Sequence, residues 1–190
     1  VKQGGEEGSL YFANITYASD KAIAYLVNLK DDAVFAAETH QDKEGSLKLI
    51  RTCSKQDRNA AAAPAISNHE DKVGYSAGML VTTRKDLDNR FLQCGADGLA
   101  ANPRLIATAI MCSETCIIMA GVYLYVGLGI KDENVDLLLR LKALSDGGRR
   151  CVIAPGDFNI TAEAMEESGI LVALGMALIR PSSANITCHL

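Results

Sequence analysis

Two apolar segments of the sequence end in polar residues of the kinds that carry hydrolytic chemistry. The segment "CVIAPGDFNI" ends with Asp157 and Asn159, and the segment "DAVFAAETH" ends with Glu38 and His40. Residues two positions apart on a strand project to the same side. Each pair is therefore expected to share a face at the carboxyl end of a buried strand.

A third polar residue, Asn14, interrupts the apolar segment "LYFANITY" near the start of the sequence. A buried polar side chain without a partner costs free energy, so such an interruption needs a reason. A single one is explained by a loop cap or a turn hydrogen bond. Three polar sites at strand ends indicate a ligand site, because ligands of open α/β sheets bind at the carboxyl ends of the strands.

The chemistry that suits these residue types is metal-assisted attack on a phosphoester. Mg²⁺ prefers hard oxygen ligands and keeps several waters, so one or two carboxylates are enough to bind it. A carboxylate can also orient or deprotonate the attacking water, and an amide can donate to the phosphoryl oxygens. Asp, Asn and Glu supply these groups.

The surrounding pattern alternates strands and helices. Strands are expected in the three segments quoted above and in "GMLVTT", "LIATAIMC" and "CIIMAGVYLYV", the last two joined as a hairpin by "SET". Helices are expected after the capping residues Ser19 and Thr161, in "EGSLKLIRTCSKQ" with Leu47 and Ile50 facing inward, and in "DENVDLLLRLKAL". Residues 57–72 are interpreted as an irregular surface excursion. This mixture predicts a mixed-sheet α/β protein.

Composition narrows the class of protein. The chain of 190 residues is 48% hydrophobic and 22% charged, which is typical of one soluble globular domain. No apolar segment reaches the roughly 18 to 20 uninterrupted residues that a membrane-spanning helix needs. No secretory signal is visible, so an intracellular location is favoured. The formal net charge of −4 does not favour dedicated duplex binding, which usually needs a basic excess.

The cysteine pattern does not indicate a metal site. Cys112 and Cys116 are the only close pair, and no histidine lies near them in the sequence. Zinc sites usually show two such pairs, or one pair followed by spaced histidines. The cysteines are therefore interpreted as buried reduced thiols, with Cys151 on a buried strand.

The segments "VIAPGDFN" and "AVFAAETH" together resemble the endonuclease/exonuclease/phosphatase superfamily of magnesium-dependent phosphoesterases. Members carry an Asn on the first strand, a strand ending in Glu-Thr and a strand ending in Gly-Asp-Phe-Asn, and all three occur here in that order. The segment "GYSAGMLVTTRKDL" is similar to the family's Gly-Gly strand, with Ala77 in place of the first glycine. The tail "ESGILVALGMALIRPSSANITC" is similar to the endonuclease-like domains of retroelements.

This resemblance covers nearly the whole chain and implies a fold. The expected architecture is a two-sheet mixed β-sandwich flanked by helices, in four α-β-β-α layers. It would form a single domain over residues 1–190 that lacks the family's last strands.

The resemblance also implies roles for the polar residues. Glu38 would hold a Mg²⁺ ion, or Mn²⁺ in its place, with Asn14 beside it as a second metal ligand. Asp157 would orient or activate the attacking water, and Asn159 would contact the phosphate.

Three further positions follow from the same resemblance. Tyr123, in "GVYLYVGLGIKDENVDLLLRL", takes the place of a catalytic tyrosine near the phosphate, and Asn134 takes the place of an Asn that opens the next helix. His40 follows the Glu-Thr pair at the rim, and His40 and Asn134 are the expected substrate-binding residues. Phe158 would point into the core and hold the loop.

The family pattern is not met at the end of the sequence. The family finishes with an Asp on a late strand and a Ser-Asp-His motif, whereas this sequence stops at "NITCHL". His189 is not preceded by Ser-Asp, so it is not assigned that role, and His69 is expected to be exposed. If Leu190 is the natural end, the uncovered sheet edge predicts a partner chain or an oligomer.

Three functions stay open at this point. The favoured one is a magnesium-dependent phosphodiesterase of nuclease type, acting on nucleic acid or another phosphodiester. The second is a catalytically inactive family member that serves as a binding or structural subunit. The third is a phosphatase for a small phosphorylated molecule, which the lack of a basic groove mildly favours over a nuclease.

Overall fold

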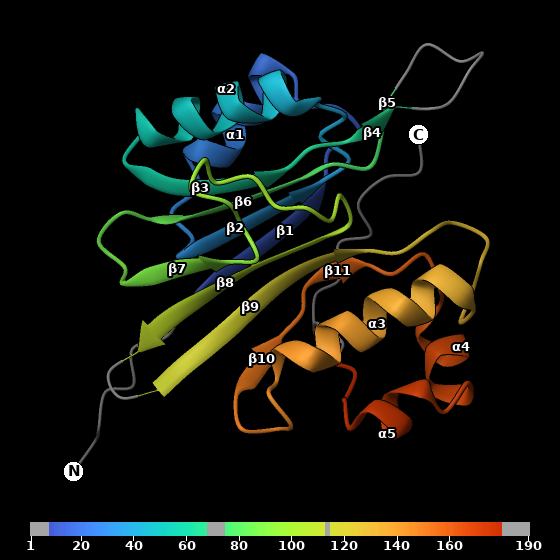
Figure 1. Cartoon of the computed structure of the whole chain (residues 1–190). Coiled ribbons are helices and arrows are strands. Elements are labelled where there is room, and N and C mark those ends of the chain that lie inside the picture. Colours follow the sequence, from blue (N-terminus) through green and yellow to red (C-terminus); the bar gives the residue numbers. More distant parts are fainter. Residues whose placement is uncertain (1–7, 68–74, 113–114, 180–190) are drawn as a thin grey trace.

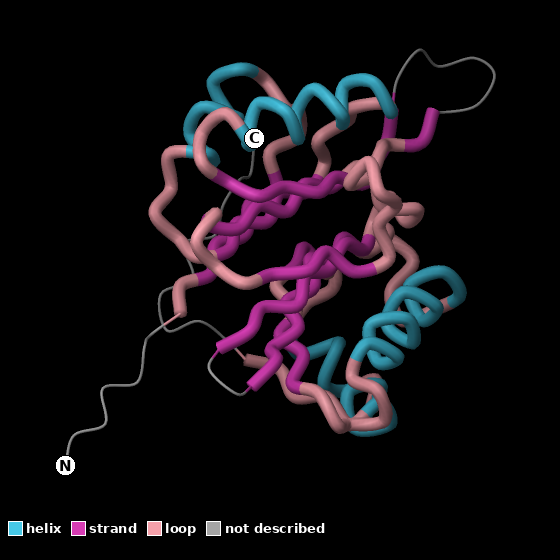
Figure 2. Tube along the Cα trace, turned by 60° about the vertical axis from the view of Figure 1, so that its left-hand side comes forward, coloured by secondary structure: helices cyan, strands magenta, loops and turns pink. Residues whose placement is uncertain are grey.

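The computed structural model describes residues 8–67, 75–112 and 115–179. Two β-sheets stack face to face, and helices cover both outer faces (Figures 1 and 2). The expected four-layer α-β-β-α sandwich is therefore confirmed. The helices α1 and α2 lie over the first sheet, and α3, α4 and α5 lie beside the second (Figure 1).

The first sheet has the strand order β1-β2-β6-β3, and its middle strands are buried on both faces. Its strands are β1 (Leu10–Asn14), β2 (Ala33–Ala37), β6 (Met79–Arg84) and β3 (Arg58–Ala63). β1 and β2 run parallel, whereas β6 is antiparallel to both β2 and β3. All five residues of β2 are buried, which explains why this strand is apolar without alternation.

The second sheet is built around a long hairpin, with the order β10-β9-β8-β7 and β11 paired to the end of β9. Its strands are β7 (Asn89–Leu92), β8 (Leu105–Cys112), β9 (Thr115–Tyr123), β10 (Cys151–Ile153) and β11 (Gly156–Asp157). β10 and β11 both run parallel to β9, so one chain segment pairs with it twice. A separate two-stranded ribbon contains β4 (Ile66–Ser67) and β5 (Tyr75–Ser76).

Among the described residues, five helices form the outer layers. They are α1 (Asp20–Val27), α2 (Lys43–Ser54), α3 (Asp132–Leu144), α4 (Ala162–Glu167) and α5 (Ile170–Leu174). Ser19 and Thr161 accept hydrogen bonds from helical N–H groups, as their sequence positions predict. The inward face of α2 differs from the prediction, because Leu49 and Cys53 are buried whereas Leu47 is only half-buried.

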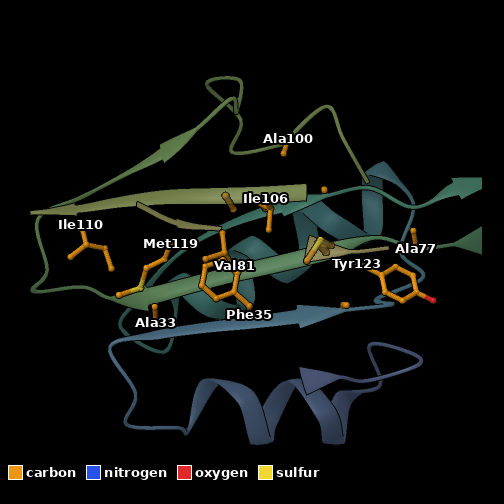
Figure 3. Close-up of a cluster of buried hydrophobic side chains, with 13 residues drawn as sticks. Ala33, Phe35, Ala77, Val81, Ala100, Ile106, Ile110, Met119 and Tyr123 are labelled. Atoms are coloured by element: carbon orange, nitrogen blue, oxygen red, sulfur yellow. The ribbon is translucent and has the colours of Figure 1, made fainter. Parts of the chain in front are cut away.

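The main core lies between the sheets (Figure 3). Phe35 of the first sheet stands opposite Gly121 of the second, where an added Cβ atom would lie 2.6 Å from the Phe35 ring. Glycine therefore allows the two sheets to approach closely at this point. Tyr123 lies at one end of the cluster, with its hydroxyl pointing away from Phe35 (Figure 3). That end of the core is where the candidate site begins.

The segment 57–72 contains a strand that the sequence does not reveal. Residues 58–63, "RNAAAA", form the buried strand β3 instead of part of a surface excursion. Alanine has a weak preference for strands, so the pattern lacks the β-branched signal on which the prediction relied. β3 is nevertheless stable here because α2 covers one of its faces and β6 pairs with its edge.

The segment before Asp157 also differs from the prediction of a buried strand. β10 lies at the edge of the second sheet, and Cys151 and Ile153 are exposed. Only the two residues of β11 continue along β9 as far as the site. The prediction that Cys151 is a buried thiol is therefore wrong, because its strand pairs only with β9 in the part of the chain that the structure describes.

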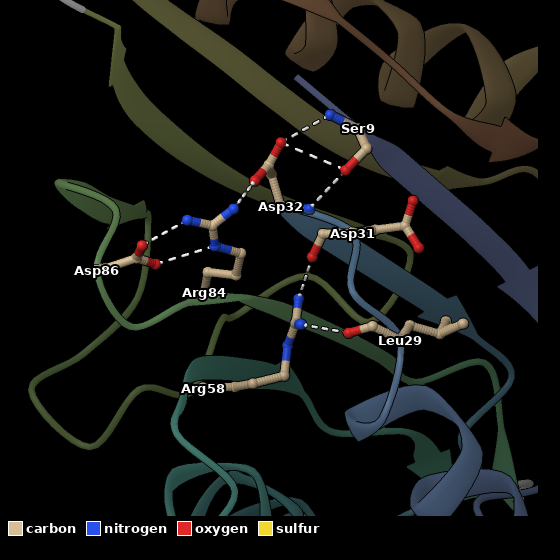
Figure 4. Close-up of polar contacts among 7 residues, drawn as sticks. All are labelled: Ser9, Leu29, Asp31, Asp32, Arg58, Arg84 and Asp86. Atoms are coloured by element: carbon tan, nitrogen blue, oxygen red, sulfur yellow. Dashed lines mark hydrogen bonds and ion pairs between the residues drawn. The ribbon is translucent and has the colours of Figure 1, made fainter. Parts of the chain in front are cut away.

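The far end of the first sheet is closed by a polar network (Figure 4). Arg58 is buried, and its guanidinium donates to Thr82 Oγ1 at 2.8 Å and to the backbone oxygens of Leu29 and Asp31, each at 2.9 Å. Burial lowers the pKa of Arg58. Arg84 pairs with Asp32 at 2.9 Å nearby.

None of the helices in the described ranges has both the length and the apolar content that a membrane-spanning helix needs.

Candidate active site

Four strand ends meet at one edge of the sandwich. In the first sheet, Asn14 at the end of β1 stands opposite Ala37, the last residue of β2, so it lies beside Glu38. In the second sheet, Asp157 at the end of β11 stands opposite Tyr123 at the end of β9. The sequence places these four polar residues far apart, and the two sheets bring them together.

Two hydrogen bonds join the sheets at this edge. Asn14 Nδ2 donates to Asp157 Oδ2 at 3.0 Å. The Tyr123 hydroxyl donates to Glu38 Oε1 at 2.5 Å. Each carboxylate of the site is therefore held by one neutral donor from the opposite sheet, a contact that is stronger than a bond between two neutral groups.

The backbone leaves the strand conformation before Glu38. Glu38 and His40 have positive φ values of 59° and 51°, which is uncommon for residues other than glycine. Backbone bonds from Thr39 N to Gly78 O and from His40 N to Ala77 O, both 3.1 Å, hold this turn. Glu38 and His40 do lie near each other, with His40 Nε2 3.9 Å from Glu38 Oε1, but a turn brings them together instead of strand alternation.

Asp157 and Asn159 are also linked through a turn. Asn159 has a φ of 49°, and its backbone N–H donates to Asp157 Oδ1 at 3.1 Å. Its Nδ2 donates to the backbone oxygen of Leu124 at 2.8 Å. An amide nitrogen has two donors, and the structure assigns one of them to Leu124. Phe158 packs against the core cluster on the far side of the second sheet, which agrees with its expected role.

The acidity of Tyr123 is changed by its surroundings. Burial and the hydrogen bond to Glu38 raise the pKa of Tyr123 to about 12, although the charge of Arg104 opposes this change. The hydroxyl therefore stays protonated near neutral pH, where it acts as a hydrogen-bond donor to Glu38.

The remaining two predicted residues lie in different settings. His40 is partly exposed, with 28% of its side chain accessible, so it stands at the rim. Asn134 is completely buried at the start of α3, where it accepts from Tyr125 N at 2.7 Å and donates to Tyr125 O and Gly129 O. A buried side chain with these bonds cannot touch a substrate, so the expected substrate contact for Asn134 is corrected to support of the 125–129 loop.

Sequence reasoning missed Arg104, which lies directly before β8. Its guanidinium carbon lies 4.7 Å from the centre of the Tyr123 ring and 3.9 Å from the centre of the Tyr125 ring. A lone arginine between "NP" and an apolar strand gives no periodic signal, so only the hairpin register could have indicated it. The expectations for His69 and His189 concern residues outside the described ranges.

The donor set fits a hard divalent cation. Within the described residues, no group of three or more His, Cys, Asp and Glu side chains comes together, so a zinc-type cluster is absent there. Glu38, Asp157 and Asn14 offer carboxylate and amide oxygens at one edge. Because Mg²⁺ keeps several waters and needs only one or two carboxylates, these residues suit Mg²⁺.

Comparison with known proteins identifies the fold. No family model matches the sequence, and no curated protein is similar to it. Solved structures do match. The endonuclease domain of TRAS1, a telomere-specific non-LTR retrotransposon, is 16% identical with a TM-score of 0.56, covering 88% of this chain and 72% of that chain.

Two further structures agree. An endonuclease/exonuclease/phosphatase family protein from Leptotrichia buccalis C-1013-b is 15% identical with a TM-score of 0.55, covering 87% of this chain and 72% of that chain. The 3′-5′ exonuclease NExo from Neisseria meningitidis is 13% identical with a TM-score of 0.51, covering 86% and 70%. The chain has the same fold as these three structures, which confirms the fold that the resemblance predicted. It spans 54% to 72% of the length of eight of the matched structures.

Proposed function

We propose that the chain hydrolyses phosphodiesters in a magnesium-dependent, nuclease-like reaction. The observation that carries this proposal is the pair of cross-sheet hydrogen bonds, Asn14 to Asp157 and Tyr123 to Glu38. These bonds fix two carboxylates at the edge where four strands end. Preorganised carboxylates beside amide donors are what water attack on a phosphate requires.

The residues divide the work between metal binding and activation of water. Glu38 and Asn14 would hold Mg²⁺ or Mn²⁺, and the bound ion would supply charge neutralisation at the phosphoryl oxygens. Tyr123 keeps Glu38 oriented, because its hydroxyl donates a hydrogen bond to Glu38 Oε1. Asp157 accepts from Asn14 and from Asn159 N, and a carboxylate has further lone pairs with which to orient or deprotonate a water.

The phosphate would be held on the second-sheet side. Asn159 uses one Nδ2 donor to reach Leu124 O, which fixes its side chain and leaves the other donor for a phosphoryl oxygen. His40, at the rim, would contact the substrate beyond the reacting phosphate. The attacking water would lose a proton to Asp157 as its oxygen forms a bond to phosphorus. The bond from phosphorus to the leaving oxygen would break, and that oxygen would take up a proton from solvent.

Nucleic acid is the proposed substrate class. Two structures with the same fold are named as an endonuclease domain and a 3′-5′ exonuclease, and the site offers the same type of hydrolytic chemistry. A small phosphorylated molecule is the second candidate, because the net charge of −4 does not favour a strong hold on a polyanion. A plasmid and a phosphomonoester, compared at equal enzyme concentration, separate these two substrates.

The first test is plasmid nicking in Mg²⁺ against EDTA, for the unmodified chain and for Asp157→Asn. We expect magnesium-dependent nicking that Asp157→Asn reduces by about 100-fold or more, since removing one member of a catalytic set removes most of the rate. Asp136→Asn on α3 is the matched control, because Asp136 is exposed and pairs only with Arg140 on the same helix. Absence of nicking and of phosphomonoester hydrolysis would favour the inactive binding or structural subunit.

We also propose that a strand from another chain covers the outer edge of β1. Within the described residues, β1 pairs only with β2, so its other edge has no strand partner in that part of the chain. Open edges of this kind invite pairing. Sedimentation of the protein over a range of concentrations tests this, and a strictly monomeric protein would contradict it.

A further inference from the structure

Arg104 is a buried cation whose guanidinium is only partly hydrogen-bonded, although a hydrogen bond joins it to the Tyr123 side chain. Only 9% of its surface is exposed, and its Nε and Nη1 atoms have no hydrogen-bond partner in the structure. Arg58 is buried as well, yet its Nε, Nη1 and Nη2 atoms each reach an oxygen at 2.8 or 2.9 Å. A buried charge with two unsatisfied nitrogens is costly, so the position of Arg104 needs a reason that the position of Arg58 does not.

The position of Arg104 follows from the hairpin register. Its backbone oxygen accepts from Tyr123 N at 2.9 Å, so the two residues stand directly opposite each other, just beyond the Leu105–Val122 pair. Cross-strand partners project to the same face of a sheet. Tyr123 belongs to the core between the sheets, so Arg104 extends into the same inter-sheet space at the site end.

Two aromatic rings enclose the guanidinium. The Tyr123 ring contacts it from β9, and the Tyr125 ring contacts it from the following loop. Tyr125 is itself held in place, because both of its backbone groups bond to the buried side chain of Asn134. Stacked arginine contributes favourable cation–π energy on both rings, and this partly offsets the missing hydrogen bonds.

The contacts form one continuous connection from the loop to the metal-binding carboxylate. Asn134 fixes Tyr125, the Tyr125 ring contacts Arg104, Arg104 contacts the Tyr123 ring, and the Tyr123 hydroxyl holds Glu38. Tilting the Tyr123 ring would move its hydroxyl away from Glu38 Oε1. The stacked guanidinium opposes that tilt.

We propose that Arg104 is a positioning residue for the proposed hydrolysis. Arg104 holds Tyr123 in the orientation in which the Tyr123 hydroxyl orients Glu38 for the metal ion. This inference rests on the proposed function, because Glu38 matters as a metal ligand only if the site binds a metal. Arg104 acts through Tyr123 and does not touch the reacting atoms.

The first experiment observes Tyr123 directly and does not depend on metal or activity. The unmodified chain and the variants Arg104→Gln, Arg104→Lys and Arg58→Gln are labelled with ¹³C at the tyrosine Cζ atoms, and their NMR spectra are compared. The signal that is missing from the spectrum of Tyr123→Phe is the signal of Tyr123. We expect Arg104→Gln to move the Tyr123 signal and Arg104→Lys to move it less. Arg58→Gln should lower stability without moving it, because Arg58 lies at the far end of the first sheet. An unmoved Tyr123 signal in Arg104→Gln would overturn the proposal.

The second experiment measures the Mg²⁺ concentration that gives half-maximal nicking. Loss of a residue that orients a metal ligand typically costs about 10- to 100-fold in metal affinity. Arg104→Gln and Tyr123→Phe should each raise the half-maximal concentration by about this factor. The double variant should be no worse than Tyr123→Phe alone, since the two residues act in series. Additive losses would contradict the proposal.

The two experiments also separate this proposal from the proposed function. If the unmodified chain shows no magnesium-dependent nicking while Arg104→Gln moves the Tyr123 signal, the hydrolytic function fails and the positioning of Tyr123 stands. Circular dichroism reveals whether Arg104→Gln folds. If it does not, Arg104→Lys replaces it, alone and combined with Tyr123→Phe, in the same comparison of single and double variants.

Discussion

Asn14 Nδ2 and Asp157 Oδ2 lie 3.0 Å apart, although 143 residues separate them in the sequence. Asn14 ends β1 of the first sheet and Asp157 ends β11 of the second. This bond, together with the one between Tyr123 and Glu38, ties the two halves of the sandwich together at the site. The distance between the sheets at this edge therefore decides whether the site is assembled.

Removing the Asn14 side chain tests this relationship. Asn14→Ala should reduce nicking by about 10- to 100-fold, because Asp157 loses the donor that orients it and the metal loses a neighbouring ligand. Asn28→Ala is the control, since Asn28 Nδ2 donates to Ala24 O at the end of α1. Asn28 directly precedes Leu29, whose backbone oxygen accepts from Arg58 at the far end of the first sheet. Equal nicking rates for Asn14→Ala and the unmodified chain would contradict the proposed site.

The raised pKa of Tyr123 predicts a dependence of stability on alkaline pH. The pKa is about 12 in the folded protein against 10.0 in its ordinary state, so the folded state holds this proton more tightly. The unfolded chain loses the proton from about pH 10 upward, and the free energy of unfolding should fall as the pH rises from about 10 to about 12.

Denaturant unfolding of the unmodified chain and of Tyr123→Phe checks this sign. The unmodified chain should lose stability relative to Tyr123→Phe as the pH rises from about 9 to about 11.5. The pKa of Tyr11 is also raised to about 12, mainly by its hydrogen bond with Tyr25, but Tyr11 is present in both proteins and cancels. Parallel pH profiles for the two proteins would refute the expected shift.

Arg58 should carry much of the stability of the first sheet. Arg58→Met removes three hydrogen bonds and leaves Thr82 Oγ1 and two backbone oxygens without their donor. We expect a loss of about 2 to 4 kcal/mol in the free energy of unfolding, measured in urea. Arg140→Met should cost about 0.5 kcal/mol or less, because Arg140 forms only an exposed pair with Asp136. Similar losses for both variants would show that the buried bonds are not special.

Gly121 tests how tightly the sheets are packed. In Gly121→Ala the new Cβ atom would lie 2.6 Å from Phe35 Cδ1 and 2.9 Å from Met79 Cε, so the sheets or these side chains must shift. The expected cost is about 1 to 3 kcal/mol. Gly8→Ala is the control, because the nearest atom to its Cβ would be 3.9 Å away. Nicking should fall with Gly121→Ala even where the protein is folded, since both cross-sheet bonds depend on this spacing.

Several elements could be predicted from local sequence, because their signals are local. The apolar run of β2, the capping residues Ser19 and Thr161, and the hairpin of β8 and β9 all occur where the sequence indicates. β3 could not be predicted from its sequence, because its alanines have no strand preference of their own. The burial that stabilises this strand comes from its contacts with α2 and β6. Cys151 was misplaced because exposure depends on whether a strand has one neighbour or two.

The sequence by itself determined which residues stand at the strand ends, namely Asn14, Glu38 and Asp157, and the type of chemistry that suits them. Only the tertiary structure decided which of these groups meet. The bonds from Asn14 to Asp157 and from Tyr123 to Glu38 cross between sheets, so they depend on sheet packing and register, which no local pattern encodes. Burial excluded Asn134 from contact with a substrate, so it supports a loop instead. Strand pairing placed Arg104 beside Tyr123.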